Sequence, residues 1–175
     1  MSGHYLILGG ARSGKSAYGE KVALTLGSRP AYLATGQARD AEMRRRIAEH
    51  QHVRDPRLTT IEEPLALIST LQETGVDHDL VLVDCLTLWI TNMMMADEDV
   101  AEAIVALTEW MNHHSTPKLV LISNEVGLGV VPDNRMARQF RDLAGMAHQR
   151  IAEQADTVAF VAAGLPMALK GTLPV

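Results

Sequence analysis

A short segment near the start of the chain has the residue types and spacing of a phosphate-binding loop. It reads Gly-Gly-Ala-Arg-Ser-Gly-Lys-Ser at residues 9–16, which fits the pattern G-x-x-x-x-G-K-[ST]. The glycines allow a tight turn whose successive N–H groups point toward one anion. Lys15 adds a mobile positive charge, the Ser16 hydroxyl can bind Mg²⁺, and the helical pattern that follows presents its positive dipole end. We therefore expect the chain to bind a nucleoside triphosphate.

A carboxylate follows a second buried apolar run. The run 80–83 ends at Asp84, and P-loop enzymes use an acidic residue in this position to hold Mg²⁺, usually through water. The alternative is that Asp84 caps the helix that follows. Ser16 and Asp84 are therefore the predicted metal ligands, and the neighbouring Cys85 is expected to be a small core residue.

The polar stretch Ser-Asn-Glu-Val-Gly-Leu-Gly at residues 123–129 follows a third apolar run. It would reach the same edge of the sheet as the phosphate loop. It could position the triphosphate or a second substrate, or it could be an ordinary loop. It is not the Asn-Lys-x-Asp sequence with which regulatory GTPases read guanine, which argues against a signalling switch.

Positive charge is clustered in residues 40–54. Arg46, His50 and Arg54 are spaced four apart, so they would share one face of a helix. A neutral imidazole beside a phosphate is a competent nucleophile. Spacing alone nevertheless favours the plainer interpretation, a solvated basic face. No spacing of histidine, cysteine and carboxylates predicts a zinc site.

Strand-like and helix-like segments alternate along the chain, which is typical of an α/β domain with a largely parallel sheet covered on both faces. Ligands of such sheets bind beyond the carboxyl ends of the strands. Trp89 and Met93–Met95 are expected in the core or at a subunit contact. Strands are predicted at 4–9, 31–35, 58–62, 80–85, 119–124 and 157–162. Helices are predicted at 15–26, 40–52, 65–74, 86–95, 100–113 and 134–153.

Length and composition predict one domain, residues 1–175, with a sizeable core. The chain is 47% apolar and 21% charged, and its net charge of −5 offers no general attraction to nucleic acid or anionic lipid. A single cysteine excludes an internal disulfide and fits a reducing compartment. Neither a membrane-spanning apolar run nor a secretory pattern is present in the sequence. A cytoplasmic enzyme is the resulting expectation.

Taken together, these segments resemble the bifunctional adenosylcobinamide kinase / adenosylcobinamide-phosphate guanylyltransferase family of cobalamin (vitamin B12) biosynthesis. The similarity extends along nearly the whole chain. The phosphate loop alone defines only a superfamily, whereas SNEVG-x-G-x-VP after a VDCLTLW strand is much more specific. The matching pieces are GGARSGKS at 9–16, YLATG at 32–36, EMRRRIAEH at 42–50, TTIEEP at 59–64, VLVDCLTLWITN at 81–92 and SNEVGLGVVPDNRMARQFRDLAG at 123–145.

The resemblance implies two reactions at one site. ATP or GTP phosphorylates the aminopropanol hydroxyl of adenosylcobinamide. GTP then transfers GMP to an enzyme histidine, releasing pyrophosphate, and the cobinamide phosphate takes the GMP to give adenosyl-GDP-cobinamide. The R-I-x-x-H pattern makes His50 the predicted guanylylated residue, with His52 a weaker candidate, and Lys15 would neutralise transition-state charge. The alternatives are a single-activity P-loop small-molecule kinase without a covalent GMP-enzyme, and a nucleotide-dependent switch or assembly ATPase.

The resemblance also implies a RecA-like P-loop fold, a three-layer sandwich with a mostly parallel central sheet. It implies a homotrimer with sites near subunit boundaries. The expected cofactor is Mg²⁺, and the expected partners are GTP or ATP, adenosylcobinamide and its phosphate, with no nucleic acid and no membrane. The chain departs from the family at Leu58, where a tryptophan is common, so ring stacking at that position is not expected.

Four further residues are candidate nucleotide contacts: Thr35 and Gly36 after the second strand, Arg54, and Glu62 after the third strand. Arg54 could equally be a solvent-exposed charge and Glu62 a strand-end carboxylate. The full set predicted to contact the nucleotide is Gly9, Gly10, Ala11, Arg12, Ser13, Gly14, Lys15, Ser16, Thr35, Gly36, Gln51, His52, Val53, Arg54, Glu62 and Asp84.

Overall fold

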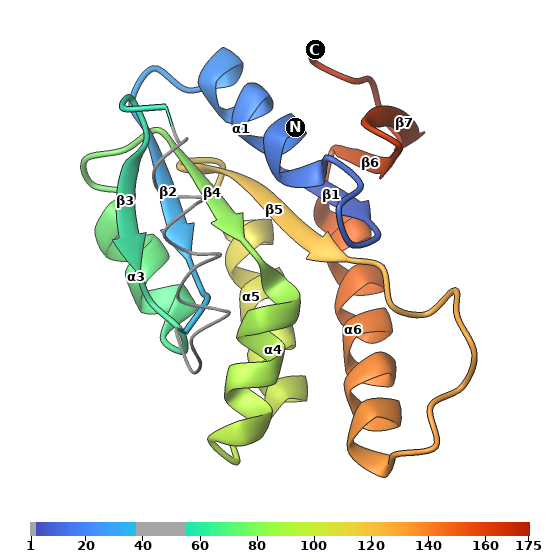
Figure 1. Cartoon of the computed structure of the whole chain (residues 1–175). Coiled ribbons are helices and arrows are strands. Elements are labelled where there is room, and N and C mark those ends of the chain that lie inside the picture. Colours follow the sequence, from blue (N-terminus) through green and yellow to red (C-terminus); the bar gives the residue numbers. More distant parts are fainter. Residues whose placement is uncertain (1–2, 38–54) are drawn as a thin grey trace.

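The computed structural model describes residues 3–37 and 55–175, and in this part of the chain the elements form three layers (Figure 1). The middle layer is a seven-stranded sheet in the order β3-β2-β4-β5-β1-β6-β7. All neighbouring strands are parallel except β6 and β7, which are antiparallel. The strands are β1 (Tyr5–Gly9), β2 (Pro30–Ala34), β3 (Thr59–Glu62), β4 (Leu80–Asp84), β5 (Lys118–Asn124), β6 (Thr157–Ala162) and β7 (Leu165–Lys170). The helices are α1 (Lys15–Leu26), α3 (Leu67–Thr74), α4 (Leu86–Met95), α5 (Val100–His113) and α6 (Arg135–Gln154).

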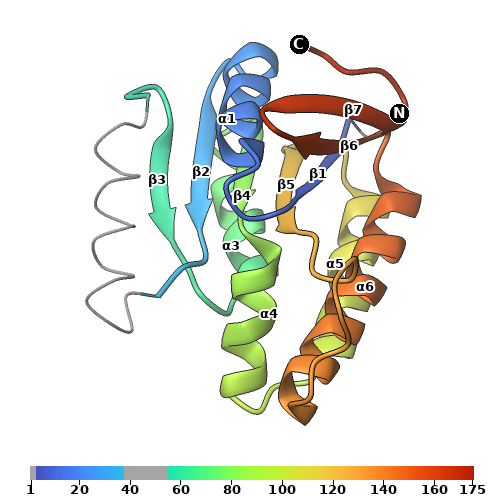
Figure 2. The same cartoon turned by 45° about the vertical axis from the view of Figure 1, so that its right-hand side comes forward.

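Helices cover both faces of the sheet, which explains why its central strands are continuous apolar runs. Side chains of a strand alternate between the two faces. In β1, Leu6 and Leu8 therefore enter the larger core cluster beneath α3, α4, α5 and α6, whereas Ile7 enters the smaller cluster beneath α1. The two sides are visible in Figure 2. The predicted α/β sandwich with a mostly parallel sheet is confirmed.

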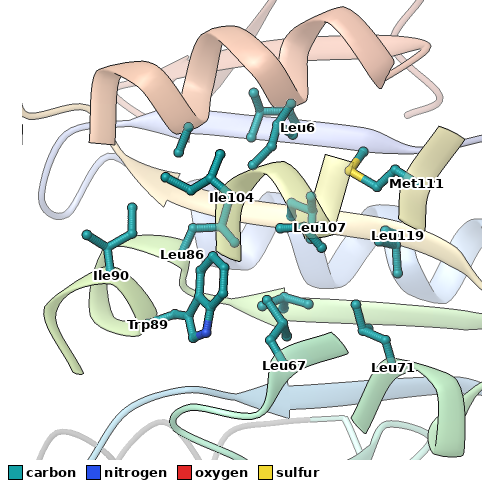
Figure 3. Close-up of a cluster of buried hydrophobic side chains, with 14 of the residues drawn as sticks. Leu6, Leu67, Leu71, Leu86, Trp89, Ile90, Ile104, Leu107, Met111 and Leu119 are labelled. Atoms are coloured by element: carbon teal, nitrogen blue, oxygen red, sulfur yellow. The ribbon is translucent and has the colours of Figure 1, made fainter. Parts of the chain in front are cut away.

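The larger cluster is built around α4 and α5 (Figure 3). Trp89 is 1% exposed, and its Nε1 donates to the Leu65 carbonyl at 2.9 Å, so the indole is both packed and hydrogen-bonded. Met93 is buried in the same cluster, whereas Met95 is 56% exposed. The core alternative of this prediction is confirmed for Trp89 and Met93, and the exposure of Met95 leaves the alternative of a subunit contact for that residue.

Most of the predicted elements are present, and the differences have local causes. Helix α3 begins at Leu67, two residues later than predicted, because the Glu63 carboxylate accepts hydrogen bonds from the backbone N–H groups of Leu65 and Ala66 and holds them in a turn. The helix predicted at 40–52 lies outside the described residues. Within the described part of the chain, no helix is long and apolar enough to cross a membrane.

Strand β7 is not predicted from the sequence. Pro166 lies within it, and a proline weakens the expectation of a strand because it cannot donate to the hydrogen-bond ladder. The strand forms at the sheet edge, where Pro166 pairs with Val161 of β6. A tight turn at Ala163 and Gly164, with φ of 52° and 78°, reverses the chain between the two strands. The sequence pattern missed this hairpin because its turn contains one alanine in the left-handed region.

Candidate nucleotide-binding site

The phosphate loop connects β1 to α1 with the backbone geometry that its glycines predict. Gly14, with φ of 93°, lies in the left-handed region directly before the first helical residue, Lys15. The Lys15 side chain is only 8% exposed, and its Nζ donates to the Gly10 carbonyl at 3.1 Å. The loop therefore folds back over its own lysine, and the N-terminus of α1 faces the space that the loop encloses.

One buried hydroxyl of the loop fits a bound anion, and one glycine is required by the packing around it. The Ser13 hydroxyl oxygen is buried and has no hydrogen-bond partner among the described residues. A buried polar atom without a partner costs about 1–3 kcal/mol, which a bound phosphate oxygen would offset. At Gly9, a Cβ would lie 2.6 Å from the Val161 carbonyl oxygen and 2.5 Å from the Ser13 hydroxyl oxygen. The close packing therefore requires glycine at position 9.

The turn between β6 and β7 packs against the phosphate loop and donates a hydrogen bond to its backbone. The Gly164 N–H donates to the Ser13 carbonyl at 2.8 Å. A Cβ built on Gly14 would lie 3.1 Å from the Gly164 Cα. Sequence reasoning missed this supporting role, because the lone Gly164 after Ala163 is a weak turn signal within an apolar run.

Asp84 ends β4, which is separated from β1 by one strand, β5. With strand spacings of about 4.8 Å, its strand lies roughly 10 Å from that of the loop. One carboxylate oxygen, Oδ2, accepts a hydrogen bond from the Tyr32 hydroxyl at 2.9 Å. The N-cap of α4 is Cys85, and its side chain makes no capping hydrogen bond. The structure thus removes the alternative in which Asp84 serves only as a helix cap.

Ser16 and Asp84 lie at the same edge of the sheet and have the donor chemistry that Mg²⁺ prefers. Among the described residues, no group of three histidine, cysteine or acidic side chains could hold a metal ion. Magnesium bound with phosphates takes only one or two protein carboxylates, with water and phosphate oxygens completing the octahedron. The residues present therefore fit a metal held jointly with a nucleotide, where it would neutralise developing phosphate charge.

Thr35 positions the end of β2 against the end of β4. Its side chain is fully buried. The Thr35 hydroxyl donates to the Cys85 carbonyl at 2.7 Å and accepts from the Cys85 N–H at 2.9 Å. The Thr35 N–H also donates to the Asp84 carbonyl at 3.2 Å. Because both hydrogen bonds of this hydroxyl go to the backbone next to Asp84, Thr35 holds the end of β4 in place. The next residue, Gly36, is half-buried.

Cys85 is a core residue, as expected. It is buried in the smaller cluster. Burial, together with the nearby negative charge of Asp84, raises the pKa of its thiol to about 11. The neutral thiol therefore persists at physiological pH, and Cys85 acts as a small apolar side chain.

The remaining predicted contacts lie away from the loop or outside the described residues. Glu62 is exposed at the end of β3, the edge strand. Four strand spacings separate β3 from β1, roughly 19 Å, so Glu62 cannot touch a phosphate held in the loop and could only reach the far end of a nucleotide or another substrate. The predicted residues His50, Gln51, His52, Val53 and Arg54 lie outside the described part of the chain.

The chain at the end of β5 is held by hydrogen bonds where it passes the phosphate loop. Because β5 lies between β1 and β4, its carboxyl end opens between the loop and Asp84. The Glu125 N–H donates to the Gly9 carbonyl at 3.0 Å, and the Asn124 amide donates to the Thr87 hydroxyl at 2.9 Å. Beyond them the chain runs outward beside α6 (Figures 1 and 2).

This geometry defines the class of protein as a P-loop nucleotide-binding enzyme. An ATPase of a bacterial type III secretion system has a similar solved structure, with a TM-score of 0.58 and 11% identity. The match covers 96% of this chain and 57% of that one, and at this identity it concerns the fold alone.

The family profile described as "Cobinamide kinase / cobinamide phosphate guanyltransferase" matches residues 5–169, and the chain belongs to this family. The Bifunctional adenosylcobalamin biosynthesis protein CobP of Pseudomonas aeruginosa is 48% identical over 168 residues, which is 95% of this chain and 96% of the relative. The Bifunctional adenosylcobalamin biosynthesis protein CobU of Salmonella typhimurium is 34% identical over 186 residues, 94% of this chain and 98% of the relative. The resemblance that the sequence motifs indicated is confirmed.

Proposed function

We propose that this chain phosphorylates the aminopropanol hydroxyl of adenosylcobinamide and then transfers GMP from GTP to the product, yielding adenosyl-GDP-cobinamide. The observation that carries the proposal is the family match over residues 5–169, together with a phosphate loop whose buried Ser13 hydroxyl and enclosed Lys15 fit an anion. The relatives named above are bifunctional, which supports both activities in one chain.

In the proposed kinase step the loop amides and Lys15 would hold the β- and γ-phosphates, and Ser16 and Asp84 would hold Mg²⁺, which would neutralise developing phosphate charge. The cobinamide hydroxyl oxygen bonds to the γ-phosphorus while the bond from that phosphorus to the β–γ bridging oxygen breaks. In the proposed guanylylation step a His50 ring nitrogen bonds to the α-phosphorus, and pyrophosphate leaves with the bridging oxygen. The cobinamide phosphate oxygen then attacks the phosphoramidate phosphorus, and the bond from that phosphorus to the His50 ring nitrogen breaks.

Labelled GTP tests the covalent step. The protein is incubated with Mg²⁺ and GTP labelled at the α- or the γ-phosphate, denatured and analysed for bound label. We expect label from the α-phosphate alone, stable to alkali and labile to acid, which is absent in His50→Ala and retained in the matched variant His52→Ala. Loss of the label in His52→Ala and its retention in His50→Ala would move the nucleophile to residue 52.

A second measurement separates the two enzymatic functions. Wild-type protein that phosphorylates adenosylcobinamide but never carries GMP would support the single-activity kinase instead. Protein that hydrolyses GTP without using adenosylcobinamide would refute the proposed function altogether. Both outcomes are read from the same reaction by mass spectrometry of the corrinoid and of the intact chain.

We also propose that the chain works as a homotrimer in the cytoplasm. The family resemblance suggests the trimer, and the edge strand β7 offers a contact surface. Leu165, Met167 and Leu169, on alternate positions and hence on one face of β7, are 69%, 50% and 63% exposed. Light scattering should give about three times the 19.1 kDa chain mass, and a Leu165→Lys/Leu169→Lys double variant should give a lower mass. A wild-type monomer at micromolar concentration would contradict this proposal.

A further inference from the structure

A buried serine, a histidine and a glutamate meet beside the phosphate loop, and the phosphate-binding geometry does not use them. His148 lies on α6 and is 7% exposed. Its Nε2 lies 2.7 Å from the Ser123 hydroxyl oxygen, and its Nδ1 lies 3.8 Å from Glu125 Oε2. The order serine, histidine, glutamate is that of a hydrolase triad, but Ser123 is fully buried within the sheet and no substrate could reach it. The arrangement must act through the glutamate, whose side chain is 20% exposed.

One proton arrangement is consistent with both neighbours of the imidazole, the Ser123 hydroxyl at 2.7 Å and the Glu125 carboxylate at 3.8 Å. Burial lowers the pKa of His148, with the charge of Glu125 opposing this in part, so the imidazole is neutral at physiological pH. If the Ser123 hydroxyl donates to Nε2, the single ring proton resides on Nδ1 and points toward the Glu125 carboxylate. The Glu125 Oε1 oxygen accepts the Gly127 N–H. One carboxylate oxygen is therefore held by a hydrogen bond, and the other faces the imidazole at 3.8 Å.

Glu125 lies between the phosphate loop and the end of β4, where an oriented carboxylate has a chemical role. Its backbone N–H donates a hydrogen bond to the Gly9 carbonyl, so the backbone of Glu125 lies directly beside the phosphate loop. Glu125 directly follows β5, which lies between the strand of the loop and the strand that ends in Asp84. Asp84 accepts the Tyr32 hydroxyl and is the predicted metal ligand. The backbone of Glu125 thus lies at the edge of the sheet where a substrate hydroxyl would have to meet the γ-phosphate.

We propose that Glu125 is the general base of the kinase step and that His148, held by Ser123, is the residue that positions it. The carboxylate takes the proton of the attacking hydroxyl while the new oxygen–phosphorus bond forms at the γ-phosphate and ADP or GDP leaves. The proposal rests on the kinase half of the proposed function. It does not involve the guanylylation step, in which the nucleophile is a neutral imidazole and needs no base of this kind.

The two half-reactions provide an internal standard for the test. Glu125→Gln keeps the shape of the side chain and an oxygen for the Gly127 N–H but cannot accept a proton. Because a general base contributes about 100- to 10,000-fold, we expect kcat for adenosylcobinamide phosphorylation to fall by about 100-fold or more. Covalent GMP formation from GTP by the same preparation should stay within about threefold, as should KM for the nucleotide. The ratio of the two activities does not depend on how much of the protein is folded.

The positioning residue has its own variant and a matched control. In His148→Gln the carboxylate is less well oriented, so kinase kcat should fall by about tenfold or more while KM and GMP formation are retained. The control is His4→Gln, because His4 is likewise a fully buried, hydrogen-bonded histidine but lies at the opposite end of β1 from the loop. It should lower stability without changing the ratio of kinase to guanylylation activity.

Two results would overturn this inference. Either Glu125→Gln retains kinase turnover close to that of the wild type, or it loses both half-reactions equally, which would indicate a structural part for Glu125. If instead the wild-type chain fails to phosphorylate adenosylcobinamide, the proposed function fails before the variants are compared. If the wild type phosphorylates it but carries no GMP, the variant's kinase kcat and KM still decide the matter.

Discussion

Replacing Gly9 by alanine tests how tightly the phosphate loop is packed. The added Cβ would lie 2.6 Å from the Val161 carbonyl oxygen and 2.5 Å from the Ser13 hydroxyl oxygen. The serine can rotate away, but Val161 is backbone of β6 and pairs with Gly9 in the parallel ladder. Relief therefore requires β1 and β6 to separate by several tenths of an ångström, or the loop to shift.

Overpacking of this kind costs about 1–3 kcal/mol in free energy of unfolding. For a chain of this length that corresponds to a Tm lower by about 2–12 °C. If the loop shifts instead, stability is largely kept, and affinity for GTP with Mg²⁺ falls by about tenfold or more, since each 1.4 kcal/mol of lost binding energy is tenfold. Either the Tm or the affinity must therefore change.

The assay combines urea unfolding with calorimetric titration of GTP in the presence of Mg²⁺. Gly145→Ala is the matched control, because a Cβ at this helical glycine meets no atom of residues 3–37 or 55–175 within 4 Å. Alanine in a helix is favoured over glycine by about 0.5–1 kcal/mol, so the control should be slightly more stable and should bind GTP normally. A Gly9→Ala protein with both wild-type stability and wild-type affinity would refute the packing argument.

Three more outcomes follow from the buried polar groups. Burial lowers the pKa values of His4 and His148, so the unfolded chain binds more protons below about pH 6.5. The free energy of unfolding should therefore fall as the pH drops through that range. The urea midpoint of His4→Gln should vary less with pH than that of the wild type. The same dependence of the midpoint on pH in both proteins would contradict this prediction. Tyr32→Phe removes the 2.9 Å hydrogen bond to Asp84, which is worth about 1.5–3 kcal/mol. The Mg²⁺ concentration needed for half-maximal kinase activity should rise at least several-fold. The same Mg²⁺ requirement in the variant as in the wild type would count against this prediction. Cys85, whose thiol pKa is about 11, should resist iodoacetamide in the native protein and react fully in urea; rapid native labelling would show that the site opens.

The phosphate loop could be predicted from the sequence because its function depends on eight consecutive residues. The glycine positions, Lys15 and Ser16 specify a local backbone path and the groups that line it. The central strands could be predicted equally well, because a strand that is buried on both faces is an uninterrupted apolar run. Helix α5 begins where its Asp99 cap accepts the Glu102 N–H. Each of these features is encoded within a few residues of where it acts.

The family could also be recognised from the sequence, because SNEVGLGVVP after VDCLTLW is a long, specific order of residues. The same motifs did not reveal what each residue does in space. Thr35 was predicted as a nucleotide contact, yet its hydroxyl is engaged by the backbone of Cys85. Glu62 was grouped with the nucleotide contacts, although its strand is the sheet edge farthest from β1 on that side.

Only the tertiary structure decided which distant residues meet. The pairing of Tyr32 with Asp84 depends on β2 and β4 being neighbours, and the contact of Ser123 with His148 depends on α6 packing across β5. No local pattern states the order of strands in a sheet, because that order results from burying all the apolar faces at once. The sequence by itself therefore determined a phosphate-loop motif at residues 9–16. The fold determined that the ends of β4 and β5 lie at the same edge of the sheet as that loop, which brings Asp84 and Glu125 to one side of the molecule.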